Sequence, residues 1–319
     1  MFSAMSSHKI AFIADPLANF NPNNETTLVL MREALRRGFE IYHTEPKDLF
    51  CENGKVGAHF LHLAIMPFKP KESFYQILAK ERCFLQDMAV VFLRKDPPFD
   101  ERYLQHLQLL MLARGQVTMI NDPAGILGAA EKILPLQFPE LCPPTVISAA
   151  AEELMAFITQ RGKPVVLKPL GLSGGAGITL LQDQDPMVQR AFLQAATCNF
   201  TRAVVAQVFL PGVKAGDKRI ILWDGAILGL FNRIAKPGEF RSNLHAGGRA
   251  VASRLSPEDQ KIVDTVGPEL LKMGLRFVGL DVIAGFLTEI NVTSPMGLAE
   301  INGFYGGAVE RKIFDTIFA

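Results

Sequence analysis

The chain has 319 residues, of which 49% are hydrophobic and 20% charged, a composition typical of a globular protein with a substantial core. A formal net charge of +1 gives no reason to expect a nucleic-acid surface, and no apolar run approaches the length of a membrane span. The four cysteines are widely spaced and form no CxxC pair, so we expect reduced thiols in a cytoplasmic protein that binds neither nucleic acid nor membrane.

Strands and helices alternate through the first third of the chain. The apolar run 88–93 has the composition of a strand covered on both faces, and Leu28, Met31 and Leu35 have helical spacing. In chain order, the sequence predicts strand 9–14, helix 24–37, strand 39–43, a hairpin across 50–63, strand 88–93, helix 101–114 and strand 117–120. This alternation predicts a doubly wound α/β domain over residues 1–128.

Polar residues follow two of these strands directly. Residues 94–100 read Arg-Lys-Asp-Pro-Pro-Phe-Asp after strand 88–93, and the segment ending at Asn19 follows the first strand. Ligands of open α/β sheets bind beyond the carboxyl ends of strands. Arg94, Asp96 and Asn19 are therefore candidate substrate-binding residues. A structural turn explains the run 94–100 equally well when that run is considered alone.

The next predicted unit, residues 129–211, carries a glycine-rich loop. In order, its predicted elements are helix 131–134, a proline-rich link, helix 151–160, strand 164–168 and strand 203–210. Lys168 ends a strand, and Gly174 and Gly175 follow in a loop whose backbone N–H groups can turn toward an anion. The P-loop and dinucleotide motifs are absent. A phosphate-covering flap and a plain hairpin turn both fit this loop.

The end of strand 203–210 has a composition that suits a purine base. Gln207 supplies an amide, while Val208, Phe209 and Leu210 supply apolar walls, and a purine needs both. Most strands of this kind belong only to the core. An adenine slot and an ordinary core strand therefore both remain open.

The last unit, residues 212–319, is predicted to be α+β, with strands 219–223 and 226–231 and helix 257–273. Arg219 would point inward from its strand, which is costly unless the guanidinium meets an anion. The loop 235–249 is long, polar and rich in arginine and glycine. Loops of this length are either disordered or lids, and this composition suits a lid that closes over anions.

A hairpin near the end of the chain carries three oxygen ligands. Glu289 and Asn291 lie two residues apart on one strand, so their side chains share a face. A turn at Ala284-Gly285 would place Asp281 across from Glu289. Two carboxylates and an amide oxygen at the edge of an apolar sheet suit Mg²⁺, which completes its shell with water and phosphate oxygens. A solvated hairpin is the alternative, and the apolar surroundings favour the metal–nucleotide site.

Together these segments resemble the ATP-grasp superfamily, and within it the bacterial glutathione synthetases. The resemblance covers nearly the whole chain, and the runs 94–100 and 288–295 are its most specific parts. It is also carried by Asp15-Pro16, residues 167–170, Asp217 to Arg219, Asn243 with residues 246–249, and residues 278–281. The resemblance implies an ATP-grasp fold with an N-terminal pre-ATP-grasp domain (1–128), a central lid domain (129–211) and a C-terminal domain with the metal site (212–319).

The resemblance also implies a role for each site residue. Lys132, on the helix that opens the central domain, and Lys168 would hold the phosphates of ATP. The remaining ATP-binding candidates are Gly174, Gly175, Gln207, Val208, Phe209, Leu210 and Asp217. The substrate-binding candidates are Asn19, Arg94, Asp96, Arg241, Asn243, Gly247, Gly248 and Ser294. Arg219 and Arg233 would be catalytic, and Asp281, Glu289 and Asn291 would bind Mg²⁺ or Mn²⁺.

The reaction implied by the resemblance joins γ-glutamylcysteine to glycine. The dipeptide carboxylate would attack ATP to give an acyl phosphate, which glycine then displaces, with Arg219 stabilising the oxyanion. The resemblance also suggests a homo-oligomer. One alternative is another ATP-grasp carboxylate–amine ligase. A second is an ATP-binding protein that has lost catalysis, because Gly171-Leu172 departs from the family pattern in the flap.

Overall fold

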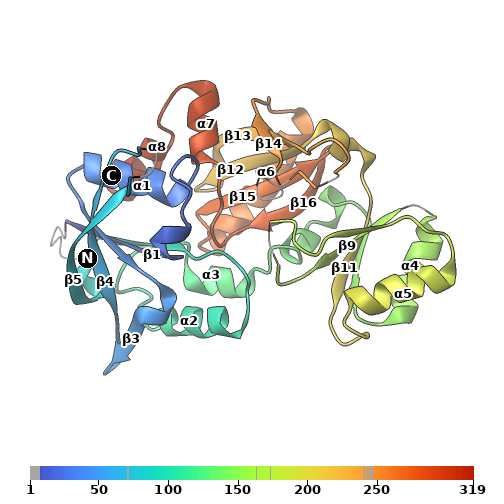
Figure 1. Cartoon of the computed structure of the whole chain (residues 1–319), viewed down its shortest axis with the longest axis horizontal. Coiled ribbons are helices and arrows are strands. Elements are labelled where there is room, and N and C mark those ends of the chain that lie inside the picture. The colour runs from blue at the N-terminus through green and yellow to red at the C-terminus, as the bar shows by residue number, and fades with distance from the viewer. Residues whose placement is uncertain are drawn as a thin grey trace.

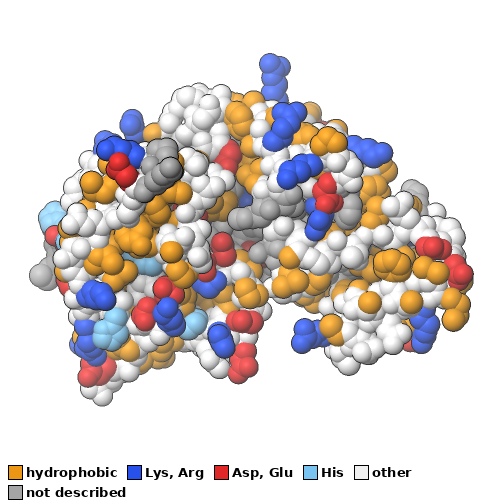
Figure 2. All heavy atoms as spheres, viewed as in Figure 1, with side chains coloured by type: hydrophobic (Ala, Val, Ile, Leu, Met, Phe, Trp, Pro, Cys, Tyr) orange, Lys and Arg blue, Asp and Glu red, His pale blue; other side chains and the backbone are white. Residues whose placement is uncertain are grey.

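Three β-sheets divide the chain into successive parts (Figure 1). The computed structural model describes residues 8–69, 72–162, 164–172, 174–239, 241–242, 244 and 247–319. The C-terminal sheet lies between the N-terminal sheet and the central sheet, and Figure 2 shows a notch between the N-terminal part and the central part. None of the helices in these ranges is long and apolar enough to cross a membrane.

The N-terminal sheet has four parallel strands at its centre. Its strands are β1 Lys9–Ala14, β2 Glu40–Thr44, β3 Leu49–Glu52, β4 Lys55–Ile65, β5 Tyr75–Phe84, β6 Val90–Arg94 and β7 Met119–Ile120. β1 pairs in parallel with β2 on one side and with β6 on the other, and β6 pairs in parallel with β7. β4 runs antiparallel to β2, β3 and β5. The strand order therefore reverses at β1.

Helices cover both faces of this sheet, as the alternating pattern predicts. The helices are α1 Thr26–Arg36, α2 Glu101–Met111, α3 Pro123–Gly128, α7 Leu298–Tyr305 and α8 Glu310–Ile317. Ile10 and Phe12 face the cluster that contains α1 and α8, whereas Ala11 and Ile13 face the cluster that contains α2. The last two helices of the chain thus return to the N-terminal part. The doubly wound arrangement predicted from the sequence is confirmed.

The predicted hairpin across residues 50–63 is also confirmed, because β3 and β4 pair around Asn53-Gly54. Both turn residues have positive φ (51° and 79°), which suits Asn and Gly in a tight hairpin. The partner strand β5 was not predicted. None of its residues is fully buried at the edge of the sheet, and its sequence lacks the alternation of apolar and polar residues that identifies a half-buried strand.

The central sheet is antiparallel, in the order β10-β9-β11-β8. Its strands are β8 Thr145–Ser148, β9 Val165–Pro169, β10 Thr179–Leu181 and β11 Val204–Val208, and its helices are α4 Ala151–Arg161 and α5 Pro186–Ala196. Both helices pack on one face, where Leu154 and Leu193 contact the strand residues Val165 and Ala206. The other face is turned toward the C-terminal sheet (Figure 1).

Two predictions in the central part need correction. Residues 131–134 do not form the predicted helix: residues 131–133 form a turn and Leu134 begins a 3₁₀ helix, because Pro135 and Pro139 lack the N–H donors that an α-helix needs beyond this point. Short 3₁₀ helices follow instead: η4 Leu134–Gln137 and η5 Pro139–Leu141. The proline-rich link also contains strand β8. The other 3₁₀ helices are η1 Leu17–Asn19, η2 Pro46–Asp48, η3 Leu85–Asp87 and η6 Pro211–Ala215.

The C-terminal sheet is antiparallel, in the order β14-β13-β12-β15-β16. Its strands are β12 Asp217–Trp223, β13 Ala226–Ile234, β14 Arg249–Val251, β15 Phe277–Ile283 and β16 Phe286–Asn291. The helix α6 Pro257–Lys272 covers one face through Ile262 and Val266, which pack with Leu280 of the sheet. On the opposite face Ile221 packs with Leu298 of α7. This second face also carries the charged residues of the site.

Candidate active site

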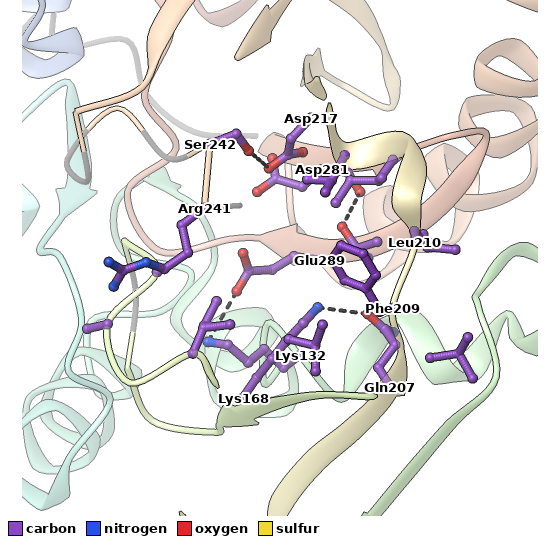
Figure 3. Close-up of a pocket in the computed structure, with 18 of the residues that line it drawn as sticks. Lys132, Lys168, Gln207, Phe209, Leu210, Asp217, Arg241, Ser242, Asp281 and Glu289 are labelled. Atoms are coloured by element: carbon purple, nitrogen blue, oxygen red, sulfur yellow. Dashed lines mark hydrogen bonds and ion pairs between the residues drawn. The ribbon is translucent and has the colours of Figure 1, made fainter. Parts of the chain in front are cut away.

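Two cavities adjoin in the middle of the molecule, and Glu289 of β16 lines both. The first lies between the central sheet and the C-terminal sheet, and we call it the inter-sheet cavity (Figure 3). The second, of about 530 Å³, lies where the residues after β1 and β6 face the C-terminal sheet. We call it the strand-end cavity.

The inter-sheet cavity is a slot with apolar walls and a charged end. Apolar side chains enter it from β9, from the segment after β11 and from η6, while charged groups enter from β12, β15 and β16. Its apolar lining includes Val166, Ile178, Val208, Phe209, Leu210, Val213 and Ile283, and its polar lining includes Lys132, Lys168, Gln207, Asp217, Asp281, Thr288 and Glu289. Such a slot suits a flat base joined to an anionic tail.

Two lysines from different segments enter the inter-sheet cavity. Lys168 of β9 donates to Gln207 Oε1 at 2.8 Å. Lys132, in the turn before η4, has its Nζ 3.2 Å from Glu289 Oε1 and also donates to the carbonyl oxygen of Leu172. Burial lowers the pKa of Lys168, although Glu289 opposes this shift. Two ammonium groups at the edge of one slot favour a ligand with several negative charges.

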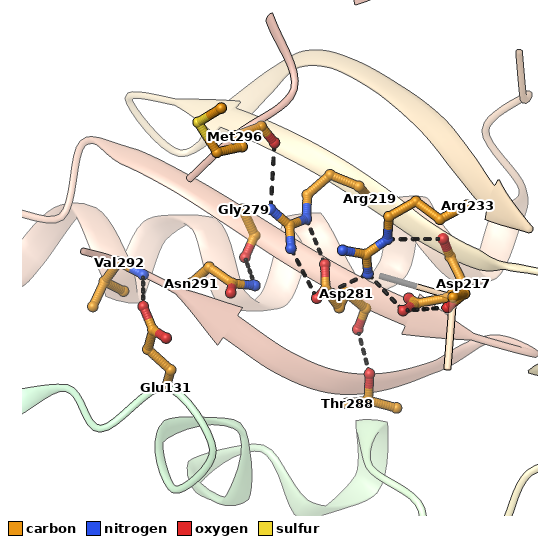
Figure 4. A network of polar contacts seen from close by, with 11 residues as sticks. Glu131, Asp217, Arg219, Arg233, Gly279, Asp281, Thr288, Asn291, Val292 and Met296 are labelled. Carbon is orange, nitrogen blue, oxygen red and sulfur yellow. Dashed lines mark hydrogen bonds and ion pairs between the residues drawn. The ribbon is translucent and has the colours of Figure 1, made fainter. Parts of the chain in front are cut away.

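A buried network of two arginines and two aspartates forms the floor of the site (Figure 4). Arg219 Nε donates to Asp281 Oδ1 at 2.6 Å, and its Nη2 donates to Oδ2 at 3.0 Å. Arg233 Nη2 lies 2.6 Å from Asp217 Oδ2 and 2.9 Å from Asp281 Oδ2. The strand register creates these pairs, because Arg219 lies opposite Asp281 and Arg233 opposite Asp217. The anion that an inward Arg219 requires is therefore Asp281.

The two aspartates of this network differ in their acidity. Burial alone would raise the pKa of Asp281, but Arg219 and Arg233 outweigh it and hold this pKa below its ordinary value. Burial raises the pKa of Asp217, and Arg233 opposes the shift only in part. Asp217 Oδ1 is buried and has no hydrogen-bond partner in the described part of the chain. One carboxylate oxygen in the wall of the inter-sheet cavity thus lacks a donor.

The predicted metal hairpin is formed by β15 and β16, and Asp281 lies opposite Glu289 in their ladder. Asn291 donates its Nδ2 to Gly279 O at 3.1 Å, so its Oδ1 is not used in that bond. Among the described residues, no three His, Cys, Asp or Glu side chains converge as a metal site. Mg²⁺ needs fewer, because it binds one or two carboxylates and takes its other oxygens from water and phosphate. The donor set at Asp281, Glu289 and Asn291 therefore fits a divalent cation.

The strand-end cavity lies at the carboxyl ends of β1 and β6, where the strand order reverses. Asp15 and Asn19 follow β1, while Arg94 and Asp96 lie at and beyond the end of β6. Ligands of doubly wound sheets bind at such a switch point, which is the reason the sequence predicted substrate-binding residues here. The described lining of the cavity includes six carboxylates and three arginines, so it carries a surplus of negative charge.

Hydrogen bonds fix the wall that follows β1. Asp15 Oδ1 lies 2.8 Å from Lys95 Nζ, and Asp15 Oδ2 accepts the backbone N–H of Asp96 at 2.8 Å. The His43 Nε2 atom lies 3.0 Å from the carbonyl oxygen of Asp15. Tyr103 donates its hydroxyl to the carbonyl oxygen of Lys95 at 3.1 Å. The loops after the two strands therefore hold each other in place across the cavity.

Glu131 fastens the segment that carries Lys132 to the end of β16. Its Oε1 accepts from the backbone N–H of Val292 at 3.1 Å and from the Thr293 hydroxyl at 2.8 Å. Its carbonyl oxygen accepts from the backbone N–H of Ile290 at 3.0 Å. Glu131 was not predicted as a site residue. The sequence did offer a signal for it, because Glu131 immediately precedes Lys132, which was predicted as a site residue.

The structure brings most of the predicted site residues to one of the two cavities. The inter-sheet cavity receives Lys132, Lys168, Gly175, Gln207, Val208, Phe209, Leu210, Asp217, Arg241, Asp281 and Glu289. The strand-end cavity receives Asn19, Arg94, Asp96, Gly174, Arg219, Arg233, Glu289, Asn291 and Ser294. Gly247 and Gly248 line neither, and Asn243 lies outside the described residues. Arg241 pairs with Glu239 at 2.6 Å rather than facing the strand-end cavity.

Sequence reasoning also missed Glu25 and Glu300, which line the strand-end cavity. Glu25 caps α1 by accepting from the backbone N–H of Thr27 at 2.9 Å, and Glu300 lies in the first turn of α7. No local pattern links these residues, which are far apart in the chain. An acidic residue in a first helical turn is usually explained by the helix dipole alone.

Two models of one protein family match the chain. The prokaryotic glutathione synthetase N-terminal domain matches residues 8–126. The ATP-grasp domain of prokaryotic glutathione synthetase matches residues 131–306. Together the two matches cover both cavities, including the strand ends of the first part and the hairpin of the last.

Curated relatives match over nearly the full length. The chain is 37% identical to the glutathione synthetase of Thermosynechococcus vestitus, over 97% of this chain and 99% of that protein. It is 39% identical to the glutathione synthetase of Rhodopseudomonas palustris, over 98% of each. It is 41% identical to that of Parasynechococcus marenigrum, over 91% of this chain and 92% of that protein.

Solved structures share the fold at much lower identity. A D-cycloserine synthetase superposes with a TM-score of 0.66 at 14% identity, over 97% of this chain and 99% of that one. An ATP-grasp RimK-domain protein from Sphaerobacter thermophilus superposes with a TM-score of 0.63 at 18% identity, over 98% of this chain and 100% of that one. These structures speak for the fold alone. With the family models they confirm the ATP-grasp fold and the N-terminal pre-ATP-grasp domain.

Proposed function

The chain belongs to the prokaryotic glutathione synthetase family, and from that premise we propose that its two cavities hold ATP and γ-glutamylcysteine while the dipeptide is joined to glycine. The observation that carries this assignment is the meeting of the cavities at Glu289. Phosphoryl transfer to a carboxylate needs the nucleotide and the acceptor side by side.

ATP occupies the inter-sheet cavity in this proposal. The base lies in the apolar slot beside Phe209 and Leu210, and the phosphates lie beside Lys132 and Lys168. The distribution of charge supports this orientation of ATP, because the lysines lie at the end of the slot that meets Glu289. Asp217 Oδ1, which lacks a donor among the described residues, is then placed to accept a hydrogen bond from a hydroxyl of the ribose.

A divalent cation, Mg²⁺ or Mn²⁺, would be held by Asp281, Glu289 and Asn291. It would neutralise charge on the phosphate oxygens during transfer. The carboxylates are held ready without it, since Glu289 pairs with Lys132 and Asp281 pairs with Arg219 and Arg233. These pairs keep the oxygens in place while avoiding unpaired buried charge.

The reaction proceeds in two steps in this account. The cysteine carboxylate of the dipeptide attacks the γ-phosphorus of ATP, the bond to the bridging oxygen breaks, and ADP leaves. The glycine amine, having lost a proton to solvent, then attacks the acyl carbon, and phosphate leaves as the amide forms. Lys132 and Lys168 hold the phosphate oxygens through the first step by charge-assisted hydrogen bonds.

Arg219 is placed to stabilise the oxyanion of the second step. Its Nε and Nη2 are fixed by Asp281, and the residue lines the strand-end cavity, so further N–H groups of the guanidinium remain for a ligand. Gly279 permits this position, because a Cβ there would lie 3.2 Å from Arg219 Cδ. A preorganised donor of this kind lowers the activation barrier by about 3 kcal/mol.

The direct test measures ADP release over a panel of dipeptides and amines. We expect release that requires γ-glutamylcysteine and glycine together, with glutathione formed in equal amount. Release with another carboxylate and amine, and none with this pair, would overturn the substrate assignment. ATP binding without any release would indicate a protein that has lost catalysis.

Location and assembly are further parts of the proposal. We propose that the enzyme works in the cytoplasm, and the four cysteines support this because all are free thiols.

We also propose a homo-oligomer. The edge strand β5 exposes Ile77 and Leu78, at 43% and 53%, which supports burial against another copy. Sedimentation of the purified chain measures its oligomeric state.

A further inference from the structure

The strand-end cavity contains two buried polar atoms that nothing in the described protein satisfies. Arg94 Nη1 and Glu300 Oε2 are both shielded from solvent, and neither has a hydrogen-bond partner among the described residues. Both residues line the cavity. Unsatisfied buried groups of opposite charge are costly, and in a binding cavity they indicate the ligand that would satisfy them.

Arg94 is a fixed guanidinium that has no counterion within hydrogen-bonding distance among the described residues. It is 2% exposed, its Nε donates to Thr27 Oγ1 at 3.2 Å, and its Nη2 donates to Pro295 O at 3.0 Å. Both partners are neutral, and no carboxylate in the described chain forms an ion pair with Arg94. Burial lowers the pKa of Arg94, and the nearby carboxylates of Glu25 and Asp96 oppose this shift only in part. A carboxylate is the natural partner for the remaining donors.

Glu300, in contrast, is an acidic residue whose Oε2 atom lacks a hydrogen-bond donor among the described residues. Burial raises the pKa of its carboxyl, and the nearby Glu25 acts in the same direction, although the backbone N–H of Glu300 itself and Arg219 oppose them. Glu25 is itself fixed by the backbone N–H of Thr27 at 2.9 Å. Two neighbouring carboxylates with one unsatisfied oxygen favour a cationic donor with several N–H groups, such as an ammonium group.

We propose that this end of the strand-end cavity binds the zwitterionic α-amino acid head of the γ-glutamyl residue. Arg94 binds the α-carboxylate, while Glu25 and Glu300 together bind the α-ammonium group. The inference rests on the proposed function and adds the orientation of the dipeptide. The cysteine carboxylate must lie at the Glu289 end to reach ATP, so the head lies at the other end. Glycine does not bind at the γ-glutamyl end of the cavity, because its amine must reach the acyl carbon of the cysteine residue, which lies at the Glu289 end.

The test compares γ-glutamylcysteine with glutarylcysteine, which lacks only the α-ammonium group. A charged hydrogen bond contributes enough to change kcat/KM by roughly 30-fold. We expect the wild-type enzyme to prefer γ-glutamylcysteine by about that factor, and Glu300→Gln to remove most of the preference. Turnover of glutarylcysteine should be nearly equal in both proteins, and the KM for ATP and glycine should not change.

The variant should fold, because Glu300 Oε2 makes no hydrogen bond within the described protein. Its Tm should equal or exceed that of the wild type, since a carboxylate with one buried oxygen that lacks a donor among the described residues is replaced by a neutral amide. Glu310→Gln is the matched control: Glu310 is 8% exposed in α8, binds Asn302 of α7 at 2.7 Å and does not line the cavity. It should leave the substrate preference unchanged. Glu25→Gln provides a second variant with the expected loss of preference.

Three results would overturn the inference while leaving the proposed function intact. One is an equal loss of kcat/KM for both dipeptides in Glu300→Gln. A second is a rise in the KM for glycine instead of for the dipeptide. The third is a wild-type enzyme that does not distinguish the two dipeptides. A wild-type chain that releases no ADP with γ-glutamylcysteine and glycine would overturn the proposed function and this inference together.

Discussion

The two cavities treat their charged side chains in different ways. In the inter-sheet cavity most charged groups have a partner within the protein: Lys132 pairs with Glu289, Asp281 pairs with Arg219 and Arg233, and Lys168 donates to the amide oxygen of Gln207. Asp217 Oδ1 has no partner among the described residues. In the strand-end cavity Arg94 Nη1 and Glu300 Oε2 have no partner within the described part of the chain, and neither has His43 Nδ1 behind its wall.

This difference indicates which property of the enzyme depends on each cavity. A cavity whose charges are paired is stable when empty and exchanges these pairs for phosphates and a cation. Unsatisfied buried groups raise the free energy of the empty cavity, and a ligand that satisfies them lowers it. Such a cavity is therefore suited to selecting among similar substrates. We therefore expect changes in the first cavity to alter catalysis and nucleotide binding, and changes in the second to alter dipeptide selection.

The largest effect is expected at the point where the cavities meet. Glu289→Ala removes a proposed cation ligand and the partner of Lys132, so kcat should fall by about a thousandfold. The circular dichroism spectrum should remain that of the wild type. The measurement is steady-state ADP release, with the exposed Glu269→Ala as control. Turnover close to wild type would remove Glu289 from the cation site.

The buried arginine–aspartate network should make the largest contribution to stability. Asp281→Ala leaves Arg219 without its bidentate partner, and removing one member of a buried pair costs about 3–5 kcal/mol. Urea unfolding measures the loss. The double variant Arg219→Met/Asp281→Ala should recover part of it, because Arg233 still pairs with Asp217. A double variant less stable than Asp281→Ala would contradict this account.

Lys168→Met should weaken nucleotide binding with little effect on the dipeptide. The loss of one charge-assisted contact of about 2 kcal/mol corresponds to a roughly 30-fold higher Kd for ATP. Calorimetric titration measures both ligands. Lys214→Met, which changes an exposed lysine of η6, provides the control. Equal weakening of both ligands would place Lys168 outside the phosphate site.

His43 should produce a pH-dependent stability below its unfolded pKa of about 6.5. Burial lowers the pKa of His43 in the folded state, so the unfolded chain binds more protons in this range. Stability is then lost as pH falls below about 6.5, by at most about 1.4 kcal/mol per pH unit. Urea unfolding at pH 7.5 and 5.5 should show a smaller loss for His43→Gln. The exposed His59→Gln should retain the wild-type loss.

The smallest effect is expected in the flap at Leu172. Lys132 contacts the backbone carbonyl of this residue and not its side chain, so Leu172→Gly retains the contact. We expect the KM for ATP to change by no more than about threefold, through the added backbone freedom of glycine. A tenfold or larger rise would show that the side chain orders the flap.

Local patterns predicted the parts of the fold that local chemistry determines. The turns Asn53-Gly54 and Ala284-Gly285 placed two hairpins, and the second placed Asp281 opposite Glu289. Helix α5 was missed although Asp185-Pro186 is a standard helix start, with Asp185 as its N-cap. Strand β5 carries no comparable signal, because apolar and polar residues do not alternate in its sequence.

The predictions of the site residues divide in the same way, into those that local segments identify and those that only the fold brings together. Lys132, Lys168 and the last hairpin could be assigned from short segments that resemble a known family. Glu25 and Glu300 could not, because each has an ordinary explanation within its own helix. Only the packing of α7 beside α1 brings them to one cavity. Selectivity that depends on distant residues requires the folded structure.

The most direct test of the central claim is a crystal structure with a non-hydrolysable ATP analogue, Mg²⁺ and γ-glutamylcysteine. The account predicts the cation at Glu289 and Asn291, the phosphates within reach of Lys132 and Lys168, and the cysteine carboxylate of the dipeptide facing the γ-phosphate. A nucleotide bound outside the inter-sheet cavity, or a cation away from β16, would contradict it.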